Sequence, residues 1–456
     1  MSPTGRNEPM TKYLMFKVAT RSDDQELAAE CLETLGNPSL GGHEFLYACI
    51  LDAQNIGSKS FAVGAMDMLV ERHNFEDSAS VHLPALIRCT IRLRVMELDT
   101  KSGEENSDRN NVIDAICRLF ETGMKRASGD LVHELMQGVA SESINKEPRD
   151  EKGHKLFTVQ ELNWFSSNSY ALGRQHCEAW GMENTIRIFK ACLSILEQYP
   201  ADIPLDDAKD ISLKAMCCHF VVAAALVSVA RTEDEIEVRQ QSYGELRKHI
   251  VGFDGHFRES VETLDADVLA DILGKMATLL IFDFEGAVAL GQWDDLREIV
   301  TMASECGDAV AYKAMADCLL RAQEVPGQVM FSTMRGIINR LSSIESMGAE
   351  DMARYIRCLF QVVLPLEGGM AFQLVADALQ LVRESATTEQ RLPDEELEWL
   401  ATMSWNHAID LYQAGKDEEC EKWSAKAISL AHYCCDEGRL EKMLQDNFTK
   451  LKCEAG

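Results

Sequence analysis

In the N-terminal part of the chain, apolar residues recur at the three- and four-residue spacing of amphipathic helices, and the pattern repeats after 34 positions. Each copy predicts a helix, a turn and a second helix, in which a small alanine after the turn lets the two helices approach closely. One such pair cannot bury its apolar face alone, so the pattern predicts stacked pairs. The matched positions are Met15, Ala19, Asp23, Ala28, Leu32 and Leu35 in the first copy and Cys49, Ala53, Gly57, Ala62, Met66 and Leu69 in the second.

The same template returns twice later in the chain, around Gly291 and around Gly415. A period of 34 residues with two helices per unit is typical of tetratricopeptide repeats. We therefore predict an all-α fold, an α-solenoid of about ten to twelve tetratricopeptide-like helix pairs, because each pair needs ~34–40 residues. The supporting positions are Leu280, Ala287, Trp293, Leu296, Val300 and Ala303 around the first glycine, and Ala408, Leu411, Cys420 and Ala427 around the second.

Polar stretches divide this helical pattern into segments. Residues 82–98 predict one long helix and 112–124 its partner, with a polar loop at 99–110 between them. A second polar stretch at 141–154 is the clearest internal break. We predict a disordered N-terminus at 1–10, repeats over 11–140, a polar linker or hinge at 141–158, repeats over 159–450 and a tail at 451–456.

Composition and charge narrow the classes of function. The chain of 456 residues has a formal net charge of −29, which excludes duplex DNA binding through a broad basic face. Its 15 cysteines lie on apolar stripes and indicate reduced core thiols. The longest apolar run, 220–230, is shorter than the roughly 20 residues that span a bilayer, and the N-terminus has no apolar signal core. We expect a soluble, acidic, intracellular protein that binds neither membrane nor nucleic acid directly.

Candidate chemistry is sparse in this sequence. There is no phosphate-binding loop, and His133-Glu134 lacks the second histidine of a zinc protease because position 137 is Gln. Two groups, Cys217-Cys218-His219 and His432 with Cys434-Cys435, bring soft ligands together, but adjacent cysteines on a helix point about 100° apart. We therefore expect no catalytic residue, no metal site, no cofactor and no small-molecule substrate. An enzyme or regulatory subunit would need a catalytic region, and no non-repetitive stretch of domain size remains for one.

Acidic residues gather where helices are expected to begin. They can form a solvated surface that favours helix N-termini, or a negative groove that attracts basic partners, and the sequence leaves both open. These residues are Glu233, Asp234, Glu235, Glu237, Asp394, Glu395, Glu396 and Glu398.

Six segments resemble a known family: 11–35, 45–54, 82–93, 161–180, 192–200 and 216–249. They are similar to the meiosis-specific tetratricopeptide scaffolds of the fungal sporulation "Spo-twenty-two / Zip-four" type, from the crossover-promoting group. The resemblance implies a non-enzymatic hub in the nucleus, on meiotic chromosomes. It implies as partners a nuclease-like heterodimer that recognises branched DNA, the meiotic MutS-type complex and synaptonemal-complex components. Family members are about twice as long, and this chain resembles their C-terminal half. The alternative is a generic tetratricopeptide adaptor of the co-chaperone or trafficking type.

Trp405 and Asn406 are the candidate partner-binding residues. Asn406 lies nine residues before Gly415, on the first helix of a repeat, where an asparagine can pair with both polar groups of an extended peptide. Trp405 would supply an aromatic anchor. The family resemblance implies the same role, because such scaffolds carry an aromatic–Asn pair near the C-terminus that contacts a synaptonemal-complex component. The competing interpretation is that Trp405 packs in the core and Asn406 is only solvated.

Overall fold

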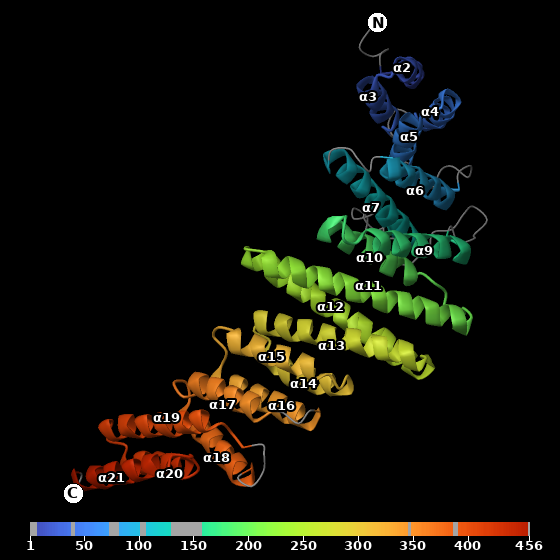
Figure 1. The fold of residues 1–456 in the computed structure, drawn as a ribbon. Helices are drawn as coiled ribbons and strands as arrows, with labels where there is room; N and C mark the ends of the chain where they lie inside the picture. Colours follow the sequence, from blue (N-terminus) through green and yellow to red (C-terminus); the bar gives the residue numbers. More distant parts are fainter. Residues whose placement is uncertain are drawn as a thin grey trace, which may run out of the picture. The chain divides into compact units, whose positions relative to one another are not determined.

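The computed structural model describes residues 7–37, 42–72, 82–100, 106–128, 157–344, 348–385 and 391–454. Within these ranges every regular element is a helix, and the 19 α-helices pack in consecutive pairs (Figure 1). This confirms the all-α class and its organisation in helix pairs. The helices form two compact units, one of Met1–Glu235 with Lys248–Leu264 and the other of Ile236–Arg247 with Asp265–Gly456.

In unit 1 each helix packs mainly on its neighbours along the chain, although α7 also packs directly on α10. Unit 1 comprises α2 (Pro9–Ser22), α3 (Gln25–Leu35), α4 (His43–Ile56), α5 (Lys59–Arg72), α6 (Leu83–Thr100), α7 (Asn106–Ser128), α9 (Val159–His176), α10 (Gly181–Leu196), α11 (Leu205–Thr232), the second half of α12 (Ile236–Ser260) and the short 3-10 helix η2 (Val261–Thr263).

In unit 2 the tightest pair is α19 with α20, and α17 and α18 pack on this pair. Unit 2 comprises the first half of α12, α13 (Ala266–Ala289), η3 (Trp293–Asp295), α14 (Leu296–Met302), η4 (Ala303–Glu305), α15 (Ala309–Arg321), α16 (Gly327–Ile344), α17 (Ala349–Val363), α18 (Gly368–Ser385), α19 (Asp394–Gln413), α20 (Asp417–Ala431) and α21 (Arg439–Glu454).

The 34-residue period is visible in the first two helix pairs. Helix α4 begins and ends 34 residues after α2, and α5 begins 34 residues after α3. Ala28 and Ala62, the alanines predicted to let the second helices approach closely, are at most 4 % exposed. The matched alanines of the first helices, Ala19 and Ala53, are fully buried. Small buried side chains let neighbouring helix axes come close together.

Four equivalent turns end the first helices of these repeats. The residues Asp23, Gly57, Gly291 and Gly415 all have a positive φ, between 56° and 79°. In each turn the N–H of the following residue donates to the carbonyl five positions earlier, at 2.9–3.0 Å, which is the Schellman arrangement that satisfies the last carbonyls of a helix. The four bonds run from Asp24 to Ala19, Ser58 to Ala53, Gln292 to Ala287 and Lys416 to Leu411.

Two predicted boundaries are wrong and one cannot be placed. The loop expected at 99–110 is shorter, because α6 runs to Thr100 and α7 begins at Asn106, with Asp108 favourably placed in its first turn. The N-terminus expected to be disordered over 1–10 includes Pro9 and Met10 of α2, where proline suits the first helical turn. The linker predicted at 141–158 lies outside the described residues except for its last two positions, 157 and 158.

Helix α11 corrects the expectation about membrane spans. Its apolar run continues into a 28-residue helix that, by length and composition, is able to cross a bilayer. Half of its apolar window is buried inside the protein, and α11 packs along α10. Its first turns also carry Asp206, Asp207 and Lys214. This is the environment of a core helix, which passes the same test of length and composition.

Two glycines of unit 2, Gly415 with a positive φ and Gly274 inside a helix, should respond in opposite ways to substitution by alanine. A methyl group at Gly415 meets no atom within 4 Å, so Gly415→Ala costs only the left-handed backbone, and we expect it to lower the free energy of unfolding by about 1–2 kcal/mol. Gly274 also meets nothing but lies inside α13, so Gly274→Ala should raise it by about 0.5–1 kcal/mol. Thermal unfolding measures both, and a destabilising Gly274→Ala would contradict this account.

Candidate functional site

The two sequence-predicted site residues lie side by side on α19 but in different environments. Trp405 is 8 % exposed and belongs to the buried face of the helix, with Ser404 and Ala408. Asn406 is exposed. Successive residues on a helix point about 100° apart, so one of an adjacent pair can face the core while the other faces solvent. Only Asn406 is therefore placed to meet a partner directly, and the partner-binding role of the pair stays a prediction.

A second tryptophan shares the face of Asn406. Trp399 precedes Asn406 by seven residues and Met403 by four, which places all three on one side of α19. Trp399 and Met403 are half-buried and Asn406 is exposed. Sequence reasoning missed Trp399, although the i, i+7 spacing could have shown that it lies on the same face as Asn406.

Trp399 is held by charged residues of α17 and α19. The guanidinium of Arg357 lies over the Trp399 ring, 4.5 Å from its centroid, and donates to both carboxylate oxygens of Glu396 at 3.1 and 3.2 Å. Behind it, the Phe360 ring meets Trp399 edge-on at 5.9 Å. The result is an oriented, half-exposed aromatic ring with a cation and a carboxylate beside it, the composition typical of interface hot spots.

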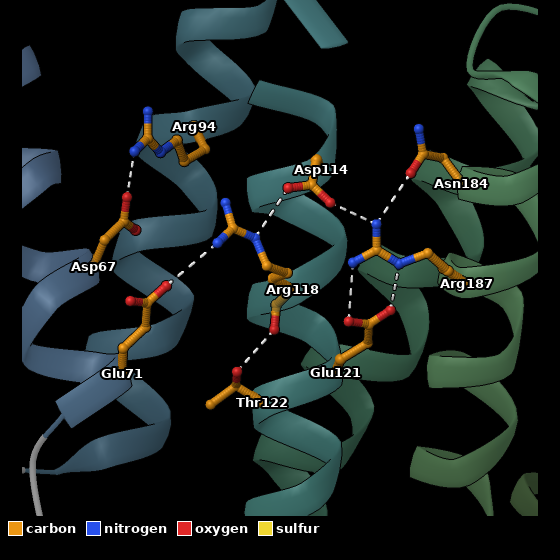
Figure 2. A network of polar contacts seen from close by, with 9 residues as sticks. All are labelled: Asp67, Glu71, Arg94, Asp114, Arg118, Glu121, Thr122, Asn184 and Arg187. Atoms are coloured by element: carbon orange, nitrogen blue, oxygen red, sulfur yellow. Dashed lines mark hydrogen bonds and ion pairs between the residues drawn. The ribbon is translucent and has the colours of Figure 1, made fainter. Parts of the chain in front are cut away.

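Unit 1 contains a network of ion pairs across α5, α6, α7 and α10 (Figure 2). Arg187 of α10 donates to both oxygens of Glu121 at 2.6 and 3.0 Å and to Asp114 of α7 at 2.6 Å. On the other side of α7, Arg118 pairs with Asp114 at 3.0 Å and with Glu71 of α5 at 3.6 Å. Arg94 of α6 pairs in turn with Asp67 of α5.

This network is structural in character. Its hydrogen bonds, first to Glu121 and then to Asp114, raise the pKa of Arg187 above its ordinary value. Each guanidinium drawn in Figure 2 already faces a carboxylate, so none is presented to an outside anion such as a phosphate. The bridging of four helices by such pairs fixes the spacing of their axes.

Three histidines from two helices meet in unit 1, a cluster that the linear sequence did not reveal. The Nδ1 atoms of His219 and His249 are 2.9 Å apart and share a hydrogen bond, and the His256 ring lies 5.9 Å from that of His219. Gly252 makes room for the ring, since a Cβ there would sit 2.4 Å from His219 Cε1. Burial first, then the neighbouring histidines, lowers the pKa of His219 to about 3. His219 therefore stays neutral at physiological pH.

Of the fourteen cysteines whose side chains the structure describes, six are buried, six are half-buried and two are exposed. Burial raises the pKa of Cys49 and Cys117 to about 12, which makes their thiols poor nucleophiles. Cys89 and Cys435 are exposed, so the expectation that the thiols lie buried on apolar stripes is wrong for these two. Across the described ranges, no three His, Cys, Asp or Glu side chains are placed to hold a metal ion.

A hollow of about 360 Å³ lies between the start of α9 and the loop that joins α10 to α11. Its floor includes Tyr199, whose hydroxyl donates to Asn163 at 2.6 Å and also contacts Ser166 at 3.0 Å. Asp202 and Asp207 line it together with two prolines. Carboxylates beside apolar walls suit a basic side chain of a partner.

Comparisons with known proteins assign no family. No protein-family model matches the chain, and no curated protein matches it. Among solved structures it is similar to a "Circular tandem repeat protein with novel repeat topology and enhanced subunit contact surfaces", at 14% sequence identity and a TM-score of 0.25, over 97% of this chain and 94% of that chain. A likeness at this TM-score says nothing about function. The protein is an all-helical repeat protein, on the strength of the helices themselves.

The network predicts unequal effects for its arginines. Arg187 is 23 % exposed with three good acceptors, so Arg187→Ala should lower the free energy of unfolding by about 1–3 kcal/mol. Arg118 is 54 % exposed, and Arg118→Ala should cost less than about 1 kcal/mol because solvent screens its pairs. Chemical denaturation measures both variants. Equal decreases in the free energy of unfolding for the two variants would contradict the prediction that the less exposed arginine contributes more.

Burial of His219 predicts acid sensitivity. An unfolded histidine titrates near pH 6.5 and folded His219 near 3, so between these values only the unfolded chain takes up the proton. The contribution of neutral His219 to the free energy of unfolding is thus present above about pH 6.5 and is lost as the pH falls. We expect the free energy of unfolding of His219→Gln to decrease by on the order of 2 kcal/mol less than that of the parent between about pH 6.5 and 4.5. Identical slopes in the parent protein and in His219→Gln would contradict this assignment.

Proposed function

We propose that this protein is a non-enzymatic scaffold that assembles crossover-promoting and synaptonemal-complex proteins on meiotic chromosomes in the nucleus. The proposal is supported by the six segments that resemble the sporulation-type tetratricopeptide scaffolds and by the helical repeat fold. The partners proposed are those that the resemblance implies: a nuclease-like heterodimer, the meiotic MutS-type complex and synaptonemal-complex components.

The observation that carries a binding role is the exposed face of α19 with Trp399, Met403 and Asn406. Asn406 offers a donor and an acceptor to the backbone of an extended partner segment. Trp399, two turns away, offers a large ring already oriented by Arg357. A partner that inserts an apolar side chain beside Trp399 and aligns its backbone along Asn406 would use both. We therefore propose Trp399 in place of Trp405 as the aromatic member of the predicted pair.

Charge favours a basic partner at this face. The first turn of α19 carries Asp394, Glu395 and Glu396, and that of α20 carries three further carboxylates. Within a chain of net charge −29 these groups attract basic segments and speed their docking.

The alternative, a generic adaptor that clamps the C-terminal carboxylate of its client, needs basic residues beside the helix-borne asparagine. Helix α19 contains neither Lys nor Arg, and the Arg357 guanidinium that lies over Trp399 is already paired with Glu396. Its neighbour His407 packs against Trp423, with ring centroids 4.7 Å apart, and is half-buried. The composition of this face therefore favours a basic or apolar segment over a free carboxylate.

The test follows a tagged protein through vegetative and meiotic cells and measures its binding to each of the three partner classes. We expect nuclear foci on meiotic chromosomes, and loss of one partner class in Trp399→Ala and in Asn406→Gln while the others remain. Gln445→Ala, at an exposed and uncharged residue of α21 in the same unit, is the matched control and should keep all partners.

Helix content and melting temperature show whether each variant is folded. If Trp399→Ala unfolds, the conservative Asn406→Gln carries the test alone. Abundant cytoplasmic protein in vegetative cells would overturn the meiotic role in favour of the adaptor. If folded Trp399→Ala and Asn406→Gln both bind every partner as the parent does, the face of α19 is not a binding site.

A further inference from the structure

The outer side of α2 carries an apolar stripe in a strongly acidic protein. Met10, Leu14 and Val18 follow one another at four-residue intervals and are 54 %, 53 % and 62 % exposed. Four-residue spacing places them in one row along the helix. Exposed charges flank this row at its two ends: Glu8 immediately precedes α2, and Arg21 lies in its last turn, followed by Asp23 at the C-cap.

The repeat register identifies this row as a stacking face. Val18 occupies the position that Asp52 occupies one repeat later, in α4. In α4 that position faces α2, since Asp52 accepts a hydrogen bond from Tyr13 at 2.6 Å, pairs with Lys17 at 3.4 Å and is only 18 % exposed. Leu14 likewise matches Ala48, which is half-buried. The outer face of α2 is therefore the same face that α4 uses to pack on its neighbour, and in the described part of the chain it stays open.

The solvent side of the last described helix, α21, is mostly polar, in contrast to the apolar stripe of α2. The solvent side of α21 includes Lys442, Gln445 and Asp446, with Met443 its exposed apolar residue at 51 %. Helix faces that a repeat protein exposes to water are usually polar, which keeps the array soluble. The exposed side of α2 is apolar instead.

We propose that the stripe of α2 binds the same stripe of a second copy of this chain, in an antiparallel pair with a two-fold axis through Leu14. The row is symmetric about Leu14, so the axis places Leu14 on Leu14 of the second copy and Met10 on Val18 of the second copy. An isologous contact requires this kind of self-complementary pattern.

The flanking charges fit the same axis. An antiparallel pairing centred on residue 14 brings Arg21 of one copy level with residues 7–8 of the other, where Glu8 lies exposed at the start of α2. Two such Arg21–Glu8 pairs, related by the axis, flank the apolar contact. A parallel arrangement would instead set Arg21 against Arg21. Because the stripe is short, the contact belongs to the small, weak class, and the dimer dissociates on dilution.

The test is sedimentation equilibrium of the full chain over a hundredfold range of concentration. The parent should pass from monomer to dimer across this range. Val18→Asp introduces the residue that the second repeat carries at this position, and Leu14→Asp sets two carboxylates together on the axis; each should leave only monomer. Leu51→Asp, at a residue of α4 that is 60 % exposed and off the stripe, is the matched control and should dimerise like the parent.

A charge exchange tests the orientation. Arg21→Glu and Glu8→Arg should each weaken dimerisation several-fold, and the double variant should restore it. Circular dichroism checks that every variant keeps its helix content. The proposal is overturned by a parent that is monomeric at every concentration, by a Leu51→Asp variant that dimerises as poorly as Val18→Asp, or by a double exchange that fails to restore the dimer. A monomeric parent that captures a helix of another protein on α2 would also overturn it.

Discussion

A tetratricopeptide-like helix pair has two apolar sides and can cover only one of them by itself, and the architecture of each unit follows from this constraint. Ala19 and Ala53, at matched positions in the first helices of the first two pairs, are fully buried. The Schellman turns after them reverse the chain without leaving carbonyls unpaired. Each added pair covers the open face of the preceding one, so stability accumulates from neighbour to neighbour.

Ion pairs formed by arginines also connect neighbouring helices within each unit. Arg88 with Glu161, Arg187 with Glu121 and Arg247 with Asp283 each connect different helices within one unit. The chain has 74 acidic and only 45 basic residues. Each of these inter-helix arginines is paired with a carboxylate, so the pairs are neutral and leave the excess of acidic residues unchanged. This excess supports the proposed recruitment of basic partners.

The face of α19 and the stripe of α2, which lie in different units, are both helix faces that are only partly covered or exposed in the described chain. At α19 the half-covered Trp399 is oriented by Arg357 and Phe360, which reduces the entropy lost when a partner binds. At α2 the register with α4 shows which surface an added helix would cover. In both proposals the binding surface is a helix face that its own unit leaves at least partly uncovered.

The sequence by itself determined the helical class, the 34-residue period and the residues of the turns, because these depend on local spacing and backbone preference. It also pointed to α19 and to Asn406. Only the tertiary structure decided that Trp405 faces the core while Trp399 is partly open, since this depends on how α17 and α20 cover α19. It alone brought His219 together with His249 and His256, and Arg187 with Glu121, from different helices. Periodicity along one chain specifies which side of a helix is apolar, whereas burial depends on which distant segment comes to lie on that side.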